Sequence, residues 1–398
     1  MELYLQFGHG MMALTRELLH NWGGGKVILS PRDLQPQQIS QFSQDVLTLG
    51  GEVLLDPQCY ARDADHHRLQ THEYFNIFQS NTSSSLLTGT GAAQLLSSLA
   101  NSVASLGIQR HILPGLLANT VDDFWFALQE RIIEEAPNHF RNGTLLATIA
   151  LSSGALLDEV QVEAVIDRAS NWPVNGFYVV AEGPTGYLVD NPNWVANLLI
   201  LTSGLKLLGK EVVVGYCNHQ SLCLAAANVD AIASGTWLNL RNFPPAKFYM
   251  PGPDEVSRRT TWYYCAQALS EYTLPFMDIA RRLNSLDLMR CPPSLGSNYA
   301  NILFSGPSPS SLGWTEREAF RHYLTCLNSQ VATTRKDSYE ETLASCLQML
   351  SEAETLLRQL HSQGISCLAR DFLMYIDVNR AALAYFDQAR GHQQRRNW

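Results

Sequence analysis

TLLATIAL, at Thr144–Leu151, is a run of apolar and β-branched residues that ends in two serines and a glycine. GFYVV at Gly176–Val180 and EVVVG at Glu211–Gly215 repeat the arrangement, and helical stretches separate such runs. Short runs of this composition, bounded by small or polar residues, are typical of buried strands. Eight of them cover the first 240 residues: Glu2–Phe7, Lys26–Leu29, Glu52–Leu55, His111–Leu113, Thr144–Leu151, Gly176–Val180, Glu211–Gly215 and Val229–Ala233.

The segments between these runs have the periodicity of amphipathic helices, as at Gln37–Leu49, Asp122–Glu135 and Val195–Leu208. Strands that alternate with helices predict parallel strands joined by right-handed crossovers. Eight such units predict an α/β fold of the (β/α)8 TIM-barrel type over residues 1–245. An open, doubly wound sheet is the alternative.

Two parts of this barrel are less regular. The fourth strand is short and is followed at once by Pro114 and Gly115. Residues 60–90 are polar and rich in serine and threonine, which predicts a long loop over the barrel mouth.

The alternation of strands and helices stops after residue 240. Asn242–Pro253 is a proline-rich connector, and residues 246–398 form a mostly helical C-terminal region. We expect the last two helices to pair with each other. The helices predicted here are Thr261–Leu283, with an interruption near Pro275, and Thr315–Val331, Tyr339–Gln363 and Arg370–Ala389.

The composition is that of an acidic globular protein. The chain has 398 residues, of which 46% are hydrophobic, and a net charge of −9, which argues against nucleic acid as the main ligand. The eight cysteines form no CxxC pair and no secretory signal precedes them, so we expect reduced thiols in a cytoplasmic protein. No apolar stretch has membrane-spanning length, and we expect no membrane association.

In a β/α barrel the chemistry lies where the strands end. Asp33, Asp56 and Glu182 follow three of the strands, and each could act as a base or accept hydrogen bonds from a ligand. Each could equally form a salt bridge, and Asp33 could cap the helix that follows it. Tyr60 and Trp237 offer aromatic faces for a planar base, although Trp237 could serve packing alone.

Two other sequence patterns superficially resemble ligand-binding sites, one for phosphate and one for a metal ion. WGGGK at Trp22–Lys26 lacks the serine or threonine of a phosphate-binding loop, so we interpret it as a helix-to-strand turn. A polar loop could assemble a metal site, but no HExxH-type spacing supports it and a solvated loop is favoured. We predict no metal and no other cofactor. The loop residues in question are Cys59, Asp63, Asp65, His66, His67 and His72.

The order of the strand ends resembles that of the tRNA-guanine transglycosylase (queuine tRNA-ribosyltransferase) family. Val213–Asp230 is similar to the family's seventh and eighth strands. Leu55–Tyr60 stands where the family has its third-strand aspartate followed by an aromatic residue. Glu182-Gly183 falls near a glycine pair of the family, and Ser152-Ser153 near its fifth-strand glutamine.

The resemblance implies a site that binds a purine-like base. Asp56 would match the family's aspartate that serves as general base or nucleophile, and Tyr60 the aromatic residue that stacks on the base. Asp56 is therefore the catalytic candidate if the protein is active. The ligand-binding residues that we expect are Asp56, Tyr60, Ser152, Glu182, Gly183, Tyr216 and Trp237.

The chain also departs from the family pattern. The covalent nucleophile of the family would fall on Ala233, which offers no nucleophilic group. Pro114-Gly115 replace a purine-reading aspartate, and the family's zinc cluster has no counterpart. These departures predict a barrel that no longer performs base exchange.

A transglycosylase-like barrel without its nucleophile resembles the transglycosylase-like ancillary proteins of type IV CBASS antiphage operons. That resemblance implies recognition of a 7-deazaguanine-type group on the N-terminus of a cGAS/DncV-like nucleotidyltransferase. A homodimer is a further expectation, since related barrels pair through their helices. The alternatives are an active transglycosylase that exchanges guanine for a 7-deazaguanine in tRNA or DNA, with Asp56 or Glu182 as nucleophile, and an unrelated barrel enzyme.

Overall fold

A computed structural model describes residues 1–141, 143–184, 186–250 and 260–398. Its main sheet has nine strands in the order β3-β2-β1-β9-β8-β7-β6-β4, and β5 pairs beside β6. All the neighbouring strands are parallel, which confirms the (β/α)8 barrel. The strands are β1 (Glu2–Gln6), β2 (Gly25–Leu29), β3 (Gly51–Leu55), β4 (Arg110–Ile112), β5 (Leu117–Ala118), β6 (Thr144–Leu151), β7 (Gly176–Ala181), β8 (Glu211–Val214) and β9 (Ala231–Ser234).

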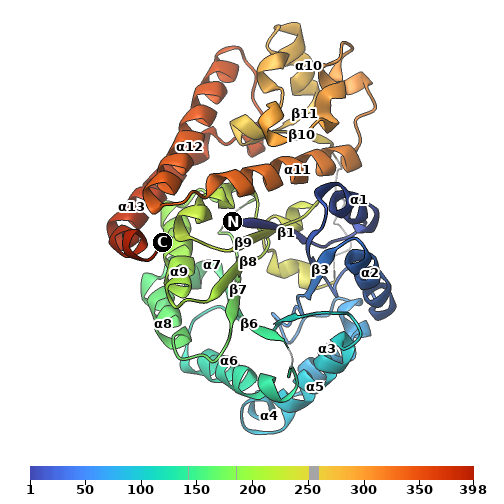
Figure 1. Cartoon of the computed structure of the whole chain (residues 1–398), viewed down its shortest axis with the longest axis vertical. Helices are drawn as coiled ribbons and strands as arrows, with labels where there is room; N and C mark the ends of the chain where they lie inside the picture. Colours follow the sequence, from blue (N-terminus) through green and yellow to red (C-terminus); the bar gives the residue numbers. More distant parts are fainter. Residues whose placement is uncertain (142, 185, 251–259) are drawn as a thin grey trace.

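Helices surround these strands on the outside of the barrel (Figure 1). Local sequence fixes several of their ends. Asp122 caps α6 by accepting a hydrogen bond from the backbone of Trp125 at 2.8 Å, and Gly23 ends α1 at a φ of 72°, so WGGGK is the expected turn. The helices of the barrel are α1 (Met12–Trp22), α2 (Pro36–Thr48), α3 (Glu73–Ser80), α4 (Ser83–Thr88), α5 (Gly91–Val103), α6 (Asp123–Glu135), α7 (Ser153–Leu157), α8 (Glu159–Ala169) and α9 (Pro192–Leu207).

The predicted loop at residues 60–90 is wrong for much of its length, because α3 and α4 lie within it. Tyr74, Phe75 and Phe78 of α3 are buried and give this short helix an apolar face. The serines and threonines serve helix ends: the side chain of Thr82 accepts a hydrogen bond from Ser85 N and caps α4. A short helix that begins with serines and threonines is as polar as a loop, so composition alone does not distinguish the two.

The C-terminal region is mostly helical, as predicted, but the part of Thr261–Leu283 before Pro275 is not an α-helix. β10 (Trp262–Cys265) and β11 (Ser270–Thr273) form an antiparallel hairpin, and α10 (Leu274–Arg282) follows. Aromatic residues in both strands suit a hairpin, whose turn places Leu269 at a φ of 50°. The part of the expected connector at residues 251–253 lies outside the described residues.

Three long helices complete the chain: α11 (Glu316–Thr334), α12 (Tyr339–Ser362) and α13 (Leu373–Asn397). α11 runs between the barrel and the hairpin and contacts both β1 and β10 (Figure 1). α13 packs on α9 of the barrel and on α12, and it continues well beyond the predicted end at Ala389. In the described part of the chain, no helix combines the length and the apolar character that crossing a membrane requires.

The hydrogen-bonded path of the sheet begins at β3 and ends at β4, so side chains help to close the barrel there. Arg110 of β4 places its Nε 2.6 Å from Oε1 of Glu52 in β3. Its Nη1 donates to the Tyr4 hydroxyl at 2.9 Å and to the Glu211 carboxylate of β8. One guanidinium therefore joins four strands at the N-terminal end of the barrel.

Arg110→Met is expected to lower the free energy of unfolding by about 3 kcal/mol, because two carboxylates lose their partner in a partly dry site. The side chain of Arg110 is 13% exposed. Arg168→Met is the matched control and should cost much less stability, since the Arg168 side chain is 48% exposed and water screens its pair with Glu130. Urea unfolding measures both losses, and equal losses would contradict this role for Arg110.

Candidate functional site

Asp56 directly follows β3 and is 1% exposed at the mouth of the barrel. Its Oδ2 accepts hydrogen bonds from the hydroxyls of Tyr60 at 2.8 Å and Tyr216 at 3.0 Å, and the Tyr178 hydroxyl lies 3.4 Å away. Its Oδ1 accepts from the backbone N–H of Gln58 at 2.9 Å. A buried carboxylate is thus enclosed by hydrogen-bond donors from three separate parts of the barrel.

The backbone on both sides of this enclosure is in an uncommon conformation. Gln58 has a φ of 56° and Tyr216 a φ of 57°, in the left-handed region that non-glycine residues rarely adopt. The side-chain amide of Gln58 helps to hold this backbone conformation. Its oxygen accepts from Arg32 N at 2.8 Å, and its nitrogen donates to Ser30 Oγ at 2.9 Å and to the Tyr216 hydroxyl at 3.1 Å. Such strain persists where surrounding contacts over-determine it, which is common at functional sites.

Burial raises the pKa of Asp56 from 3.8 to about 6. The hydrogen bonds from Tyr60, Gln58, Tyr216 and Tyr178 stabilise the carboxylate and keep the pKa from rising further. The effect of desolvation on the pKa exceeds that of the hydrogen bonds because the side chain has almost no contact with water. Asp56 therefore changes charge close to neutral pH.

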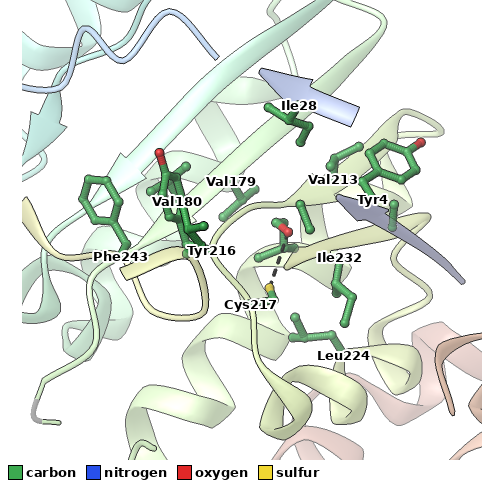
Figure 2. Close-up of a cluster of buried hydrophobic side chains, with 14 of the residues drawn as sticks. Tyr4, Ile28, Val179, Val180, Val213, Tyr216, Cys217, Leu224, Ile232 and Phe243 are labelled. Carbon is green, nitrogen blue, oxygen red and sulfur yellow. Dashed lines mark hydrogen bonds between the residues drawn. The ribbon is translucent and has the colours of Figure 1, made fainter. Parts of the chain in front are cut away.

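Two phenylalanines from the connector cover the tyrosines. The Phe243 ring packs edge-on against Tyr60 at 4.9 Å and against Tyr216 at 5.1 Å between ring centroids. Phe248 packs on Tyr60 at 5.2 Å and on Phe243 at 5.7 Å. Figure 2 shows Phe243 beside Tyr216 at one end of the buried side chains. The mouth is filled by rings of the protein itself, so Asp56 is closed to solvent in this structure.

Ser152 and Glu182 lie at the ends of β6 and β7 and serve neighbouring backbone groups. The Ser152 hydroxyl caps α7 by accepting from Ala155 N at 3.2 Å. The Glu182 carboxylate accepts from Ser153 N at 3.1 Å. These contacts tie the two strand ends together.

Gly183 allows a close approach of the connector to the barrel. A Cβ at this position would lie 2.9 Å from Oδ1 of Asn242. The preceding residue, Glu182, pairs with Phe243 through an isolated parallel bridge. Glu182 and Gly183 therefore adjoin the segment that fills the mouth.

Trp237 lies on the side of the barrel that faces the C-terminal region. Its Nε1 donates to His9 O at 3.1 Å, and its ring packs edge-on against Phe320 of α11 at 4.9 Å. The structure thus brings Asp56, Tyr60 and Tyr216 together, whereas Trp237 contacts the C-terminal region.

Asp33 does not cap the helix after it but forms a salt bridge with Arg32, the other role that we expected for it. Its Oδ2 accepts from Ser30 Oγ at 2.7 Å and from Arg32 at 3.2 Å. Gln35 caps α2 instead, in a reciprocal arrangement with Gln38.

The polar loop after Asp56 is joined to the connector. The Tyr249 hydroxyl donates to Asp63 at 2.8 Å, and Met250 N donates to Asp65 at 2.6 Å. Within residues 1–141, 143–184, 186–250 and 260–398, no group of three or more His, Cys, Asp or Glu side chains could hold a metal ion.

No protein-family model matches the sequence, and the search of curated proteins finds no match. Thiamine phosphate pyrophosphorylase from Pyrococcus furiosus is 10% identical over 59% of this chain and 85% of that chain, with a TM-score of 0.30. The carboxyl transferase domain from Rhizobium etli pyruvate carboxylase, solved with pyruvate and biocytin, is 10% identical over 98% of this chain and 60% of that chain, with a TM-score of 0.34. At these TM-scores neither likeness says anything about function. The fold is established by the sheet itself.

Ala233, where the resemblance places the nucleophile, lies in β9 opposite Tyr4 of β1. It is fully buried, and its backbone oxygen accepts a hydrogen bond from Cys217 N at 2.7 Å. A methyl group stands there, so this position supplies no nucleophile.

Sequence reasoning missed Tyr178, Gln58, Phe243 and Phe248. A tyrosine inside an apolar parallel strand needs a partner for its hydroxyl, and this rule could have drawn attention to Tyr178. Phe243 and Phe248 gave no such signal, because only tertiary packing returns the connector to the mouth.

The raised pKa of Asp56 predicts a dependence of stability on pH. The folded protein binds the Asp56 proton more tightly than the unfolded chain does. The resulting stability is therefore present below about pH 4 and is lost as the pH rises through about 6, by about 3 kcal/mol in total. Urea unfolding from pH 4 to 7 should show this loss for the wild type relative to Asp56→Asn, which has no carboxyl group there. Parallel curves would contradict the raised pKa.

Proposed function

We propose that the barrel mouth binds a 7-deazaguanine-type group carried on the N-terminus of a partner cGAS/DncV-like nucleotidyltransferase. The chain would then act in antiphage CBASS defence as a transglycosylase-like binding protein, in the cytoplasm and without base exchange. The observation that carries this proposal is the Phe243 ring, which lies between two tyrosines that both bond to a buried carboxylate.

The space that Phe243 fills suits a flat ring. Its edge-on contacts with Tyr60 and Tyr216 define a slot with aromatic walls. A deazapurine that replaced the Phe243 side chain would keep this burial and would gain stacking worth about 1–3 kcal/mol. Displacement of the connector is therefore part of the proposed binding step.

Asp56 gives the slot its chemical preference. A guanine-type ring presents several N–H groups on one edge, and a carboxylate accepts two of them side by side. The tyrosine hydroxyls already donate to the carboxylate, so a ligand must displace or reorient one of them. A purine analogue without N–H groups on that edge would leave Asp56 unsatisfied and is disfavoured.

Base exchange is disfavoured because the position of the family's nucleophile is occupied by Ala233 in this chain. A glycosyl transfer through a covalent intermediate needs a nucleophile beside the ribose, and Ala233 has none. Asp56 is 1% exposed and its oxygens are bonded to the protein's own donors, so they have no open approach to a sugar carbon. Both points favour recognition over catalysis.

The partner is inferred from the resemblance and from charge. The net charge of −9 disfavours tRNA and DNA, which a transglycosylase would have to hold. A protein terminus needs no such basic surface. A homodimer stays a prediction.

Three variants test the proposal by calorimetry with 7-cyano-7-deazaguanine and with a peptide that bears a 7-deazaguanine-type group on its N-terminus. Phe243→Ala is expected to raise the affinity about tenfold, because the slot no longer has to be vacated. Asp56→Asn should lower it at least about tenfold, because one of the acceptor oxygens is lost. Phe386→Ala, a fully buried phenylalanine of α13, is the control and should leave the affinity unchanged.

Failure of Phe243→Ala to bind either probe would exclude this slot as the binding site. Base exchange is assayed in parallel with labelled guanine and tRNA or DNA. Exchange by the wild type that vanishes in Asp56→Ala would overturn the binding role and establish the active transglycosylase. Capture of an N-terminally modified nucleotidyltransferase from the host, lost in Asp56→Asn, would support the proposed partner.

A further inference from the structure

Two of the eight cysteines touch each other. The sulfur atoms of Cys291 and Cys326 are 3.4 Å apart, within the range of a thiol hydrogen bond. Cys326 lies in α11 and is fully buried, whereas Cys291 follows a short 3₁₀ turn at Leu286–Met289 and is 7% exposed. The two residues are 35 positions apart in the sequence.

His322 lies next to the two cysteines and is held in place by hydrogen bonds. His322 precedes Cys326 by one turn of α11, and its Nδ1 lies 3.7 Å from the Cys326 sulfur. Nδ1 also bonds with Ser297 Oγ at 2.7 Å, and Nε2 lies 2.8 Å from Tyr264 O. Both ring nitrogens are engaged within the protein, so the imidazole positions the thiols and is not free to bind a metal ion.

We propose that Cys291 and Cys326 are a redox modification site that closes to a disulfide when a peroxide reaches it. A disulfide has an S–S length of about 2.05 Å, so the sulfur atoms must approach by only a little more than 1 Å. This inference does not depend on what the barrel mouth binds.

The reaction has two balanced steps. The Cys291 thiolate attacks one oxygen of hydrogen peroxide, the O–O bond breaks, and the departing hydroxide takes up the proton that the Cys291 thiol released. The sulfur of Cys326 then attacks the sulfenic acid, the S–O bond breaks, and the second hydroxide takes the proton of the Cys326 thiol. Two thiols are oxidised to one disulfide, and the peroxide is reduced to two molecules of water.

The two sulfur atoms differ in a way that assigns their roles. Cys291 is the more exposed, and a hydrogen bond from Cys326 lowers the pKa of its thiol. Burial holds the pKa of Cys326 well above its usual value. Cys291 therefore forms the thiolate that meets the oxidant, and Cys326 resolves the sulfenic acid.

The bond would lock α11 to the segment that follows α10. α11 also packs on β1, and its Phe320 ring contacts Trp237, which follows β9. Oxidation would therefore stiffen the C-terminal region next to the helix that contacts the barrel. A crosslink over this length of chain raises Tm by about 5 °C.

The full-length protein, fully reduced and then treated with hydrogen peroxide, is digested without reductant and examined by mass spectrometry. The expected product is a crosslinked pair of peptides containing Cys291 and Cys326, with the loss of two hydrogen atoms and full reversal by dithiothreitol. Tm is measured before and after oxidation. Absence of this pair, or crosslinking of other cysteines instead, would overturn the proposal.

Two variants separate the roles of the sulfur atoms. Cys326→Ser should leave a sulfenic acid on Cys291 that reacts with dimedone, whereas Cys291→Ser should give neither that label nor a disulfide. Cys346→Ser, which removes another buried thiol, is the control and should still form the crosslink. A stoichiometric metal ion that co-purifies with the protein and is lost in Cys326→Ser would show a metal site instead.

Discussion

The Asp56 carboxylate, removed from water at the barrel mouth, is the constraint around which the mouth is organised. A bare carboxylate in such a place costs several kcal/mol, so donors must converge on it from wherever the fold can supply them. They come from the turn after β3, from β7 through Tyr178, and from the end of β8 through Tyr216. The left-handed backbone at Gln58 and Tyr216 follows from this convergence, because both residues must turn back towards Asp56. Arg110 plays the complementary part at the other end of the barrel, where β3 and β4 meet.

The barrel was predictable because most of its strands are buried on both faces, and such strands have a composition that loops and helices do not share. The length of β6 and the position of all eight runs were recognisable for this reason. Prediction failed where local composition is ambiguous: Thr82 and the serines after it begin α4, and the aromatic residues around Tyr263 form a hairpin. In both places tertiary burial selects the structure, and the sequence within the segment does not.

The site was predictable in part for a related reason. Asp56, Tyr60 and Tyr216 follow strands, and the topology of a parallel barrel brings such positions to one end. Trp237 follows a strand as well, but its ring packs on Phe320 of α11 from the C-terminal region. Phe243 lies in a connector whose described part has little regular structure beyond a 3₁₀ turn at Pro245–Phe248, and this connector is bonded to the polar loop after Asp56. No rule based on local sequence could have placed its ring between two tyrosines.

The occupied mouth has a consequence for the proposed ligand. If the free protein keeps Phe243 in the slot, only a minor fraction of molecules can accept a ring, and the apparent affinity falls by that fraction. A free base offers few contacts with which to offset this loss, whereas a base attached to a protein brings the rest of its surface to the barrel. Contacts with that surface can favour the open state without touching Asp56 at all. In the proposed function, a self-filled slot would therefore discriminate a modified protein terminus from the free base, which is the selectivity that this function requires.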